Sequence, residues 1–194
     1  MQKIGLFFGS FNPIHVGHLI IANTMLENTD LHEVWFVVSP HNPHKKKSTL
    51  LHEFDRMYMV ERAIADNYRM RGIDIEFHLP RPSYTIDTLT YMVERWPDKR
   101  FVLIIGEDNL AHFHKWKNYE QILANFELYV YPRPDIVGDE IQIKNHPGIR
   151  MVEAPLLNIS ATFIRNLIRN EKSAKYLLPP EVEDLIKSRG FYKD

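Results

Sequence analysis

The sequence contains no cysteine in its 194 residues. This absence excludes disulfides, catalysis by a cysteine thiolate and metal sites built on thiolate ligands. A strong charge of either sign is also missing, since the formal net charge is −1. No overall electrostatic attraction to nucleic acid follows, so no nucleic-acid partner is expected, although a local basic patch could bind a nucleotide.

Long apolar segments and targeting signals are missing as well. No apolar run approaches the roughly 20 residues needed to span a bilayer, so no membrane partner is expected. The first residues enter a strand-like run directly, without the charged start, apolar region and cleavage site of a secretory signal. With repeats and linkers also absent, we expect a cytoplasmic protein with one domain over residues 1–194, whose oligomeric state the sequence leaves open.

The remaining composition, 44% hydrophobic and 25% charged, is that of an ordinary globular protein. Strand-like apolar runs alternate with segments of helical periodicity. This alternation predicts an α/β fold, a Rossmann-like parallel sheet with helices on both faces and additional C-terminal helices. The expected strands are 4–8, 33–39, 73–79, 101–105, 128–131 and 149–152, and the expected helices are 19–26, 54–65, 86–96, 118–126, 160–170 and 181–189.

The stretch Gly-Ser-Phe-Asn-Pro-Ile-His-Val-Gly-His at residues 9–18 joins the first expected strand to the first helix. Such a turn presents backbone N–H groups to an anion. His15 and His18 share one helical face if the helix has begun by His15. Three interpretations stay open, namely capping or solvated histidines, a metal pair and a phosphate site. Helical zinc pairs usually lie four residues apart with a third ligand nearby, so the two glycines and the proline favour phosphate.

A second segment, Ile-Ser-Ala-Thr-Phe-Ile-Arg at residues 159–165, opens a predicted helix. Ser160 is typical of a helix N-cap, and that alone would explain it. Ser160, Thr162 and the helix N-terminus would also form a cradle for one end of a polyphosphate. Arg165 lies one turn further on, and its long side chain could reach back to phosphate oxygens.

With these two motifs the chain resembles the nucleotidyltransferase superfamily that carries the His-x-x-His signature. Within it, the chain is most similar to the bacterial nicotinate-nucleotide adenylyltransferases. The resemblance implies a Rossmann-like fold and the transfer of AMP from ATP to nicotinate mononucleotide, which yields deamido-NAD and pyrophosphate. It also implies Mg²⁺ that bridges the ATP phosphates with few protein ligands. Further matching segments are Ser83-Tyr84-Thr85, Gly106, Asp108, Trp116 and Arg133-Pro134.

The sequence departs from the family pattern at four positions. Phe8 stands where a glycine is common, Ser10 and Asn12 replace threonine and aspartate, and Ala161 replaces a serine. The changes at Ser10 and Asn12 are chemically conservative. Because Ala161 lacks a hydroxyl, no phosphate contact is assigned to it.

The resemblance also implies residue roles. His15 and His18 are the expected catalytic residues, which would stabilise charge on the reacting α-phosphate. The expected protein ligands fall into two groups, one for ATP and one for the acceptor mononucleotide. The first comprises Gly9, Ser10, Phe11, Gly106, Asp108, Ser160, Thr162 and Arg165, and the second comprises Lys45, Ser83, Tyr84, Thr85, Trp116 and Arg133.

The acceptor site also permits a physical argument. The helix that starts after Ser83 has free N–H groups at its N-terminus, which suit the carboxylate of nicotinate. Trp116 could stack on the pyridine ring, although half-buried packing would equally explain a tryptophan. Asp108 follows a strand, where a carboxylate commonly binds sugar hydroxyls.

Other functions remain open at this point. The acceptor could be nicotinamide mononucleotide or pantetheine phosphate. The fold could also serve as a non-catalytic nucleotide sensor, or His15 and His18 could belong to a metal hydrolase.

Overall fold

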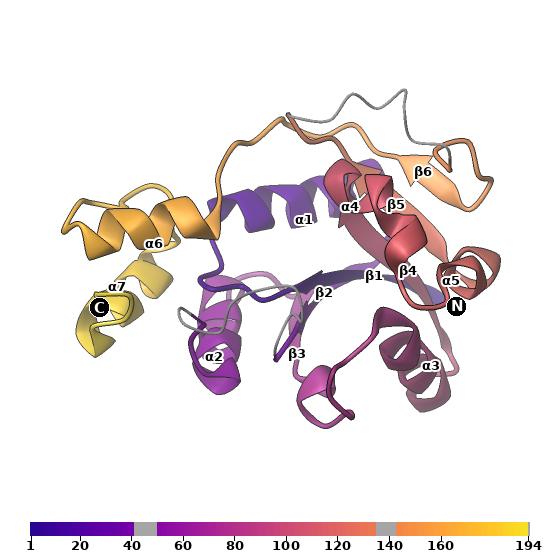
Figure 1. Ribbon diagram of the computed structural model, residues 1–194, viewed down its shortest axis with the longest axis horizontal. Coiled ribbons are helices and arrows are strands. Elements are labelled where there is room, and N and C mark those ends of the chain that lie inside the picture. The colour runs from indigo at the N-terminus through magenta and orange to yellow at the C-terminus, as the bar shows by residue number, and fades with distance from the viewer. Residues whose placement is uncertain (41–49, 135–142, 194) are drawn as a thin grey trace.

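A computed structural model describes residues 1–40, 50–134 and 143–193. Its described part contains a six-stranded sheet in the order β3-β2-β1-β4-β5-β6, and every neighbouring pair is parallel (Figure 1). The predicted α/β class is therefore confirmed. The strands are β1 (Gln2–Gly9), β2 (Glu33–Val38), β3 (Met70–Ile73), β4 (Lys99–Gly106), β5 (Glu127–Tyr131) and β6 (Ile149–Met151).

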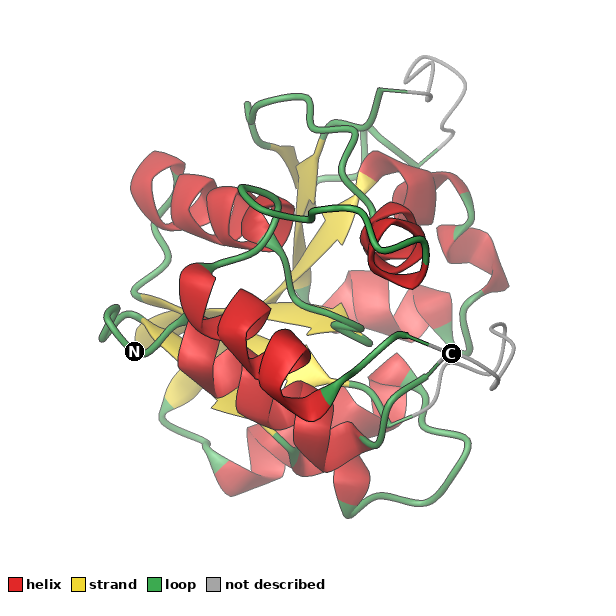
Figure 2. Ribbon diagram, turned by 90° about the vertical axis from the view of Figure 1, so that its left-hand side faces the viewer, coloured by secondary structure: helices red, strands yellow, loops and turns green. Residues whose placement is uncertain are grey.

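Helices cover both faces of this sheet (Figure 2). Within the described ranges no helix is both long enough and apolar enough to cross a membrane. The helices are α1 (Val16–Asn28), α2 (Glu53–Ala63), α3 (Thr85–Arg95), α4 (Glu107–Ala111), α5 (Tyr119–Asn125), α6 (Ala161–Arg169) and α7 (Pro180–Arg189), and the 3₁₀ turns are η2 (Ile75–Phe77) and η3 (Phe113–Lys115).

Two hydrophobic clusters lie on opposite faces of the sheet. Alternate residues of one strand enter different clusters, as Phe36 and Val37 of β2 do, so the strand is buried on both sides. Parallel strands of this kind read as continuous apolar runs, which is why the sequence reveals them. The first cluster packs α1, α2, α6 and α7 on the sheet, and the second packs α3, α4 and α5.

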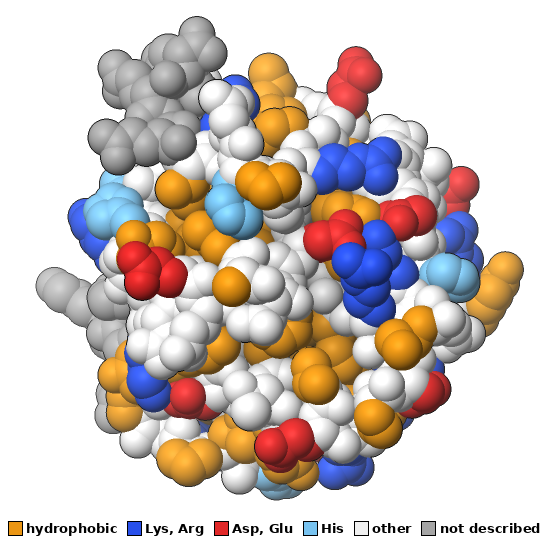
Figure 3. Space-filling view, turned by 90° about the vertical axis from the view of Figure 1, so that its right-hand side faces the viewer, with side chains coloured by type: hydrophobic (Ala, Val, Ile, Leu, Met, Phe, Trp, Pro, Cys, Tyr) orange, Lys and Arg blue, Asp and Glu red, His pale blue; other side chains and the backbone are white. Residues whose placement is uncertain are grey.

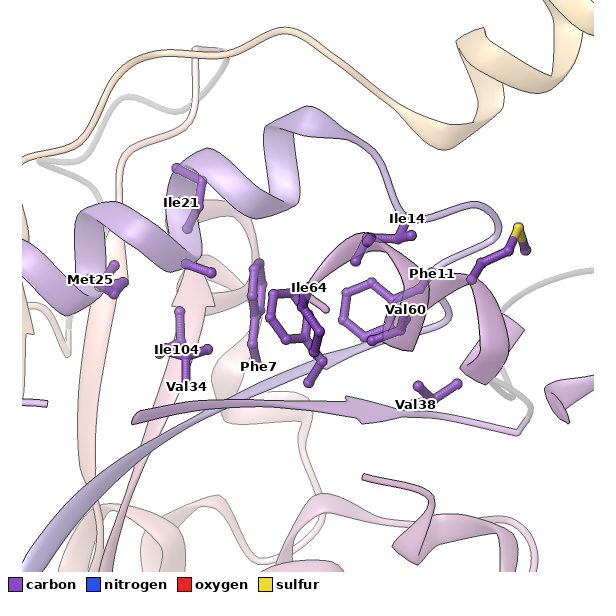
Figure 4. Close-up of a cluster of buried hydrophobic side chains, with 14 of the residues drawn as sticks. Phe7, Phe11, Ile14, Ile21, Met25, Val34, Val38, Val60, Ile64 and Ile104 are labelled. Atoms are coloured by element: carbon purple, nitrogen blue, oxygen red, sulfur yellow. The ribbon is translucent and has the colours of Figure 1, made fainter. Parts of the chain in front are cut away.

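The turn after β1 is anchored in the first cluster. Phe11 and Ile14 are buried and pack with Phe7 and Val60 (Figure 4). A side chain at Gly9 would place its Cβ 2.8 Å from the Phe11 ring, so only glycine fits beneath that ring. The core therefore fixes the position of the turn.

Two local predictions are wrong. The expected strand 73–79 does not form, because β3 ends at Ile73 and the chain then makes the 3₁₀ turn η2. Its adjacent residues Ile75 and Glu76 are both buried, which the alternation of a half-exposed strand does not allow. The capping box expected at Asn118 is also absent, since this residue has a left-handed φ of 53° and its side chain makes no cap hydrogen bond to α5.

Other helix ends follow the sequence pattern. The Ser160 hydroxyl accepts a hydrogen bond from the Phe163 N–H at 3.1 Å, so the predicted N-cap is confirmed. Gly190 follows α7 with φ of 65°, as expected of a glycine that ends a helix. Both C-terminal helices form and lie together at one end of the molecule (Figure 1).

Candidate active site

Two cavities adjoin at the carboxyl ends of β1 and β4. The larger measures about 920 Å³ and the smaller about 300 Å³, and both are lined by Gly9, Ser10 and Tyr131. In a sheet of this strand order, the switch between β1 and β4 is the usual ligand-binding position. On the face shown in Figure 3, basic and acidic side chains are interspersed.

His15 and His18 lie against each other on one wall of the larger cavity. Their rings are stacked with centroids 3.7 Å apart, and the backbone N–H of His15 donates to His18 Nδ1 at 3.2 Å. His15 is the N-cap of α1 and is 5% exposed. Burial, together with the positive charge of Arg133, lowers the pKa of His15 to about 4, so the ring is neutral at neutral pH.

Residues from α6 form a second wall of the same cavity. Ser160, Thr162 and Arg165 line it together with both histidines, as the two motifs predicted. The Arg165 guanidinium donates to the Asn12 carbonyl at 2.8 Å and to the Thr162 hydroxyl at 3.1 Å. These bonds join the turn after β1 to a helix about 150 residues later in the chain.

Arg56, which sequence reasoning missed, holds the same turn from beneath. Its side chain is fully buried and donates to the carbonyls of Ser39, Pro40 and Leu51 at 2.8–2.9 Å, and also to that of Ser10. Burial lowers its pKa to about 10, so it remains charged. Its place on the apolar stripe of α2, with Met59, Val60 and Ala63, is the signal that could have revealed it.

The smaller cavity collects most of the expected acceptor residues. Ser83, Tyr84 and Thr85 line it at the N-terminus of α3, together with Trp116. The Trp116 ring also packs on Phe113 with centroids 4.9 Å apart, so it both contacts the core and lines the cavity.

Glu76 is a further wall residue of this cavity that the sequence did not suggest. Its carboxylate accepts hydrogen bonds from Thr88 at 2.9 Å and Ser83 at 3.3 Å, which fasten η2 to the start of α3. Burial raises the pKa of this carboxyl, while its hydroxyl donors act in the opposite direction.

Two expected residues border the other cavity, and the place of a third is not described. Arg133 borders the larger cavity rather than the smaller one, and its Nε lies 3.4 Å from Asp108 Oδ1. Gly106, expected with ATP, borders the smaller cavity, and a Cβ there would lie 2.3 Å from Asp108 Oδ1. Lys45 lies outside the described residues.

The donor set of the larger cavity bears on metal binding. Within residues 1–40, 50–134 and 143–193, no group of three or more histidine, aspartate or glutamate side chains is placed to hold a metal ion. Asp108 is the acidic residue that lines the larger cavity, and it already pairs with Arg133. The Asp108 carboxylate and the Ser160 and Thr162 hydroxyls are oxygen donors, the ligand type that a hard divalent cation prefers.

Comparisons with known proteins agree with this geometry. Residues 6–167 match the family described as cytidylyltransferase-like. The chain is 63% identical over 193 residues to a protein of Cytophaga hutchinsonii and 53% identical over 192 residues to one of Flavobacterium johnsoniae, both named "Probable nicotinate-nucleotide adenylyltransferase". The first match covers 100% of both chains, and the second covers 99% of this chain and 100% of its relative.

Solved structures show the same fold. The nicotinic acid mononucleotide adenylyltransferase of Plasmodium falciparum, complexed with NaAD, superposes with a TM-score of 0.85 at 21% identity, covering 99% of this chain and 98% of that one. The full-length relatives and the family match together settle the classification. The chain belongs to the cytidylyltransferase-like family and, within it, to the nicotinate-nucleotide adenylyltransferases.

Proposed function

We propose that this chain transfers the AMP group of ATP to nicotinate mononucleotide, forming deamido-NAD and releasing pyrophosphate. The observation that carries the proposal is the meeting of two cavities at Gly9 and Ser10. One is lined by histidines, hydroxyls and arginines suited to a polyphosphate, and the other contains a helix N-terminus and an aromatic ring. The relatives named for this activity support it.

The reaction is a displacement at phosphorus. A phosphate oxygen of the mononucleotide attacks the α-phosphorus of ATP, a new P–O bond forms, and the bond to the bridging oxygen of the β-phosphate breaks. Because the acceptor phosphate is already a nucleophile, no covalent enzyme intermediate is needed. Catalysis then consists mainly of positioning and charge stabilisation.

The histidines would stabilise charge on the reacting phosphate. His18 Nδ1 accepts the backbone N–H of His15, an arrangement that leaves the ring proton of His18 on Nε2. With ATP bound, this Nε2–H would be the His18 donor to a phosphate oxygen. His15 is kept neutral by burial, and it would donate a hydrogen bond to a phosphate without adding a positive charge.

The α6 wall would hold the outgoing pyrophosphate. Arg165 is oriented by its bonds to Asn12 and Thr162, which leave part of its five-donor guanidinium for phosphate oxygens. Ser160 and Thr162 would add their hydroxyls at the helix N-terminus, and Asp108 would bind a sugar hydroxyl. Mg²⁺ would enter with ATP and neutralise charge on its phosphates.

The smaller cavity would bind the acceptor. The first amides of α3, which begins at Thr85, lack acceptors within the helix and suit the nicotinate carboxylate. Trp116 would stack on the pyridine ring. Lys45 would meet the phosphate of the mononucleotide.

An acceptor panel tests the proposal. The protein is incubated with ATP, Mg²⁺ and either nicotinate mononucleotide, nicotinamide mononucleotide or pantetheine phosphate, and pyrophosphate release is measured. We expect nicotinate mononucleotide to be used fastest. Faster use of pantetheine phosphate would refute the acceptor assignment, and equal use of the two pyridine mononucleotides would refute the role of the α3 N-terminus. ATP binding without pyrophosphate release from any acceptor would point to a nucleotide sensor.

A further inference from the structure

We propose that Tyr192, which follows α7, is a positioning residue for this reaction and acts by fixing Asn12 in the turn that carries His15. The proposal rests on the proposed function of the larger cavity. Tyr192 is not among the residues that line either cavity, so it acts through its contact with Asn12 rather than on the substrate.

Among the described residues, donors from three separate segments form hydrogen bonds to Asn12. The Tyr192 hydroxyl donates to its side-chain oxygen Oδ1 at 2.9 Å, and the Leu51 N–H donates to the same atom at 3.3 Å. The Arg165 guanidinium donates to its backbone carbonyl at 2.8 Å. Asn12 is only 4% exposed, so these bonds are formed away from solvent. Asn12 is therefore the point at which the turn, the segment before α2, α6 and the C-terminal segment meet.

The backbone is shaped to bring the tyrosine to this point. Gly190 and Tyr192 have left-handed φ values of 65° and 66°, which reverse the chain after α7. A left-handed conformation is unfavourable for a residue with a bulky side chain, so the surrounding contacts must maintain it. The neighbouring residue Arg189 pairs with Asp55 at 2.6 Å, which fastens this end of α7 to α2.

The C-terminal segment, residues 177–192, also contacts this turn before α7. The Val16 N–H, at the start of α1, donates to the Leu177 carbonyl at 3.0 Å. Two contacts from one segment, at Asn12 and at Val16, thus flank His15 in the sequence. The two contacts therefore hold the backbone on both sides of His15.

The hydroxyl of Tyr192 is suited to donation. Burial raises its pKa well above its usual value, although Arg165 and Arg56 act in the opposite direction, so the group stays protonated. A neutral O–H fixes the asparagine oxygen without adding charge beside the phosphate site. Because an active-site displacement of about 1 Å can reduce turnover about 10²-fold, loss of this bond should reach the chemistry.

The first test is Tyr192→Phe, which keeps the ring and removes the hydroxyl. We expect kcat to fall about tenfold, while the KM for nicotinate mononucleotide stays within about twofold, because Tyr192 does not line the acceptor cavity. The matched control is Tyr176→Phe, since Tyr176 is 82% exposed and also has a left-handed φ of 70°. This control should leave kcat unchanged.

A double-mutant cycle separates positioning from a merely structural role. If Tyr192 acts through Asn12, adding Tyr192→Phe to Asn12→Ala should change kcat by less than about twofold. If the fold-losses in kcat of the two single variants multiplied in the double variant, the proposal would be refuted. A kcat within twofold of the wild type for folded Tyr192→Phe, where folding is confirmed by a thermal melting midpoint above the assay temperature, would also refute it.

A binding measurement keeps this proposal distinct from the proposed function. The affinity for a non-hydrolysable ATP analogue is measured by calorimetry without any acceptor, and Tyr192→Phe should weaken it about threefold or more. If the wild type released no pyrophosphate with nicotinate mononucleotide, the acceptor assignment would fail, but the change in analogue affinity would still decide the role of Tyr192. Equal affinities for the wild type and Tyr192→Phe would refute that role.

Discussion

Two hydrogen bonds that fix the turn in the larger cavity join segments far apart in the sequence, whereas two side-chain bonds beside the smaller cavity span much shorter separations. Arg165 and Tyr192 reach Asn12 across 153 and 180 residues. Around the smaller cavity, Thr88 binds Glu76 across 12 residues and Lys117 binds Asp87 across 30 residues. Changes to the larger cavity should therefore affect stability and chemistry, and changes to the smaller one should affect acceptor recognition.

The largest effect is expected for Arg56→Met. The substitution removes the donors of four carbonyls, one in the turn and three in the segments after β2 and before α2. The free energy of unfolding should therefore fall by roughly 3–5 kcal/mol. Urea denaturation measures this loss. Arg62→Met, an exposed position in the last turn of the same helix, is the control and should change stability by less than about 0.5 kcal/mol. Similar effects of the two variants would contradict the scaffold role of Arg56.

The next largest effect is expected for His18→Ala, which should change kcat but not the KM for nicotinate mononucleotide. It should lower kcat by about 10²-fold or more, because a donor to the reacting phosphate is lost. The KM for nicotinate mononucleotide should change little, since His18 does not line the smaller cavity. Steady-state pyrophosphate release provides both values, and His32→Ala, an exposed histidine just before β2, should behave like the wild type. An unchanged kcat in His18→Ala would remove this residue from catalysis.

The smallest effect is expected for Trp116→Ala, a substitution in the wall of the smaller cavity. The loss of stacking should raise the KM for nicotinate mononucleotide about tenfold, with kcat within about twofold. Trp116→Phe retains an aromatic face and should stay within about threefold of the wild-type KM. A fall in kcat with an unchanged KM would show instead that the two cavities are not separable in this way.

The parts of the fold that were predictable share a physical cause. Strands buried on both faces, such as β2 and β4, have uninterrupted apolar runs, and such runs are typical of central strands in a parallel sheet. The Ser160 cap was predictable because side-chain capping is a local event. The expected strand at 73–79 failed because period-two alternation does not reveal that Ile75 and Glu76 are both buried.

The candidate site was predictable where residue types have a recognisable spacing. The motifs at 9–18 and 159–165 line the same cavity, as expected. Tyr192 was not found, because its partner is one amide oxygen that leaves no pattern in the sequence. For Arg56 the apolar stripe of α2 is a signal of burial, but its carbonyl partners leave none. The position of Arg133 depends on how β5 ends beside β4, which a strand's own sequence does not specify.

The bond between Tyr192 and Asn12 also has a consequence for protein synthesis. The two residues are separated by 180 positions, so a ribosome that adds about 5–20 residues per second takes about 10–40 s to pass from one to the other. During that interval the nascent chain contains the turn but not the tyrosine that donates to it. Final adjustment of the turn therefore waits until residue 192 has been synthesised.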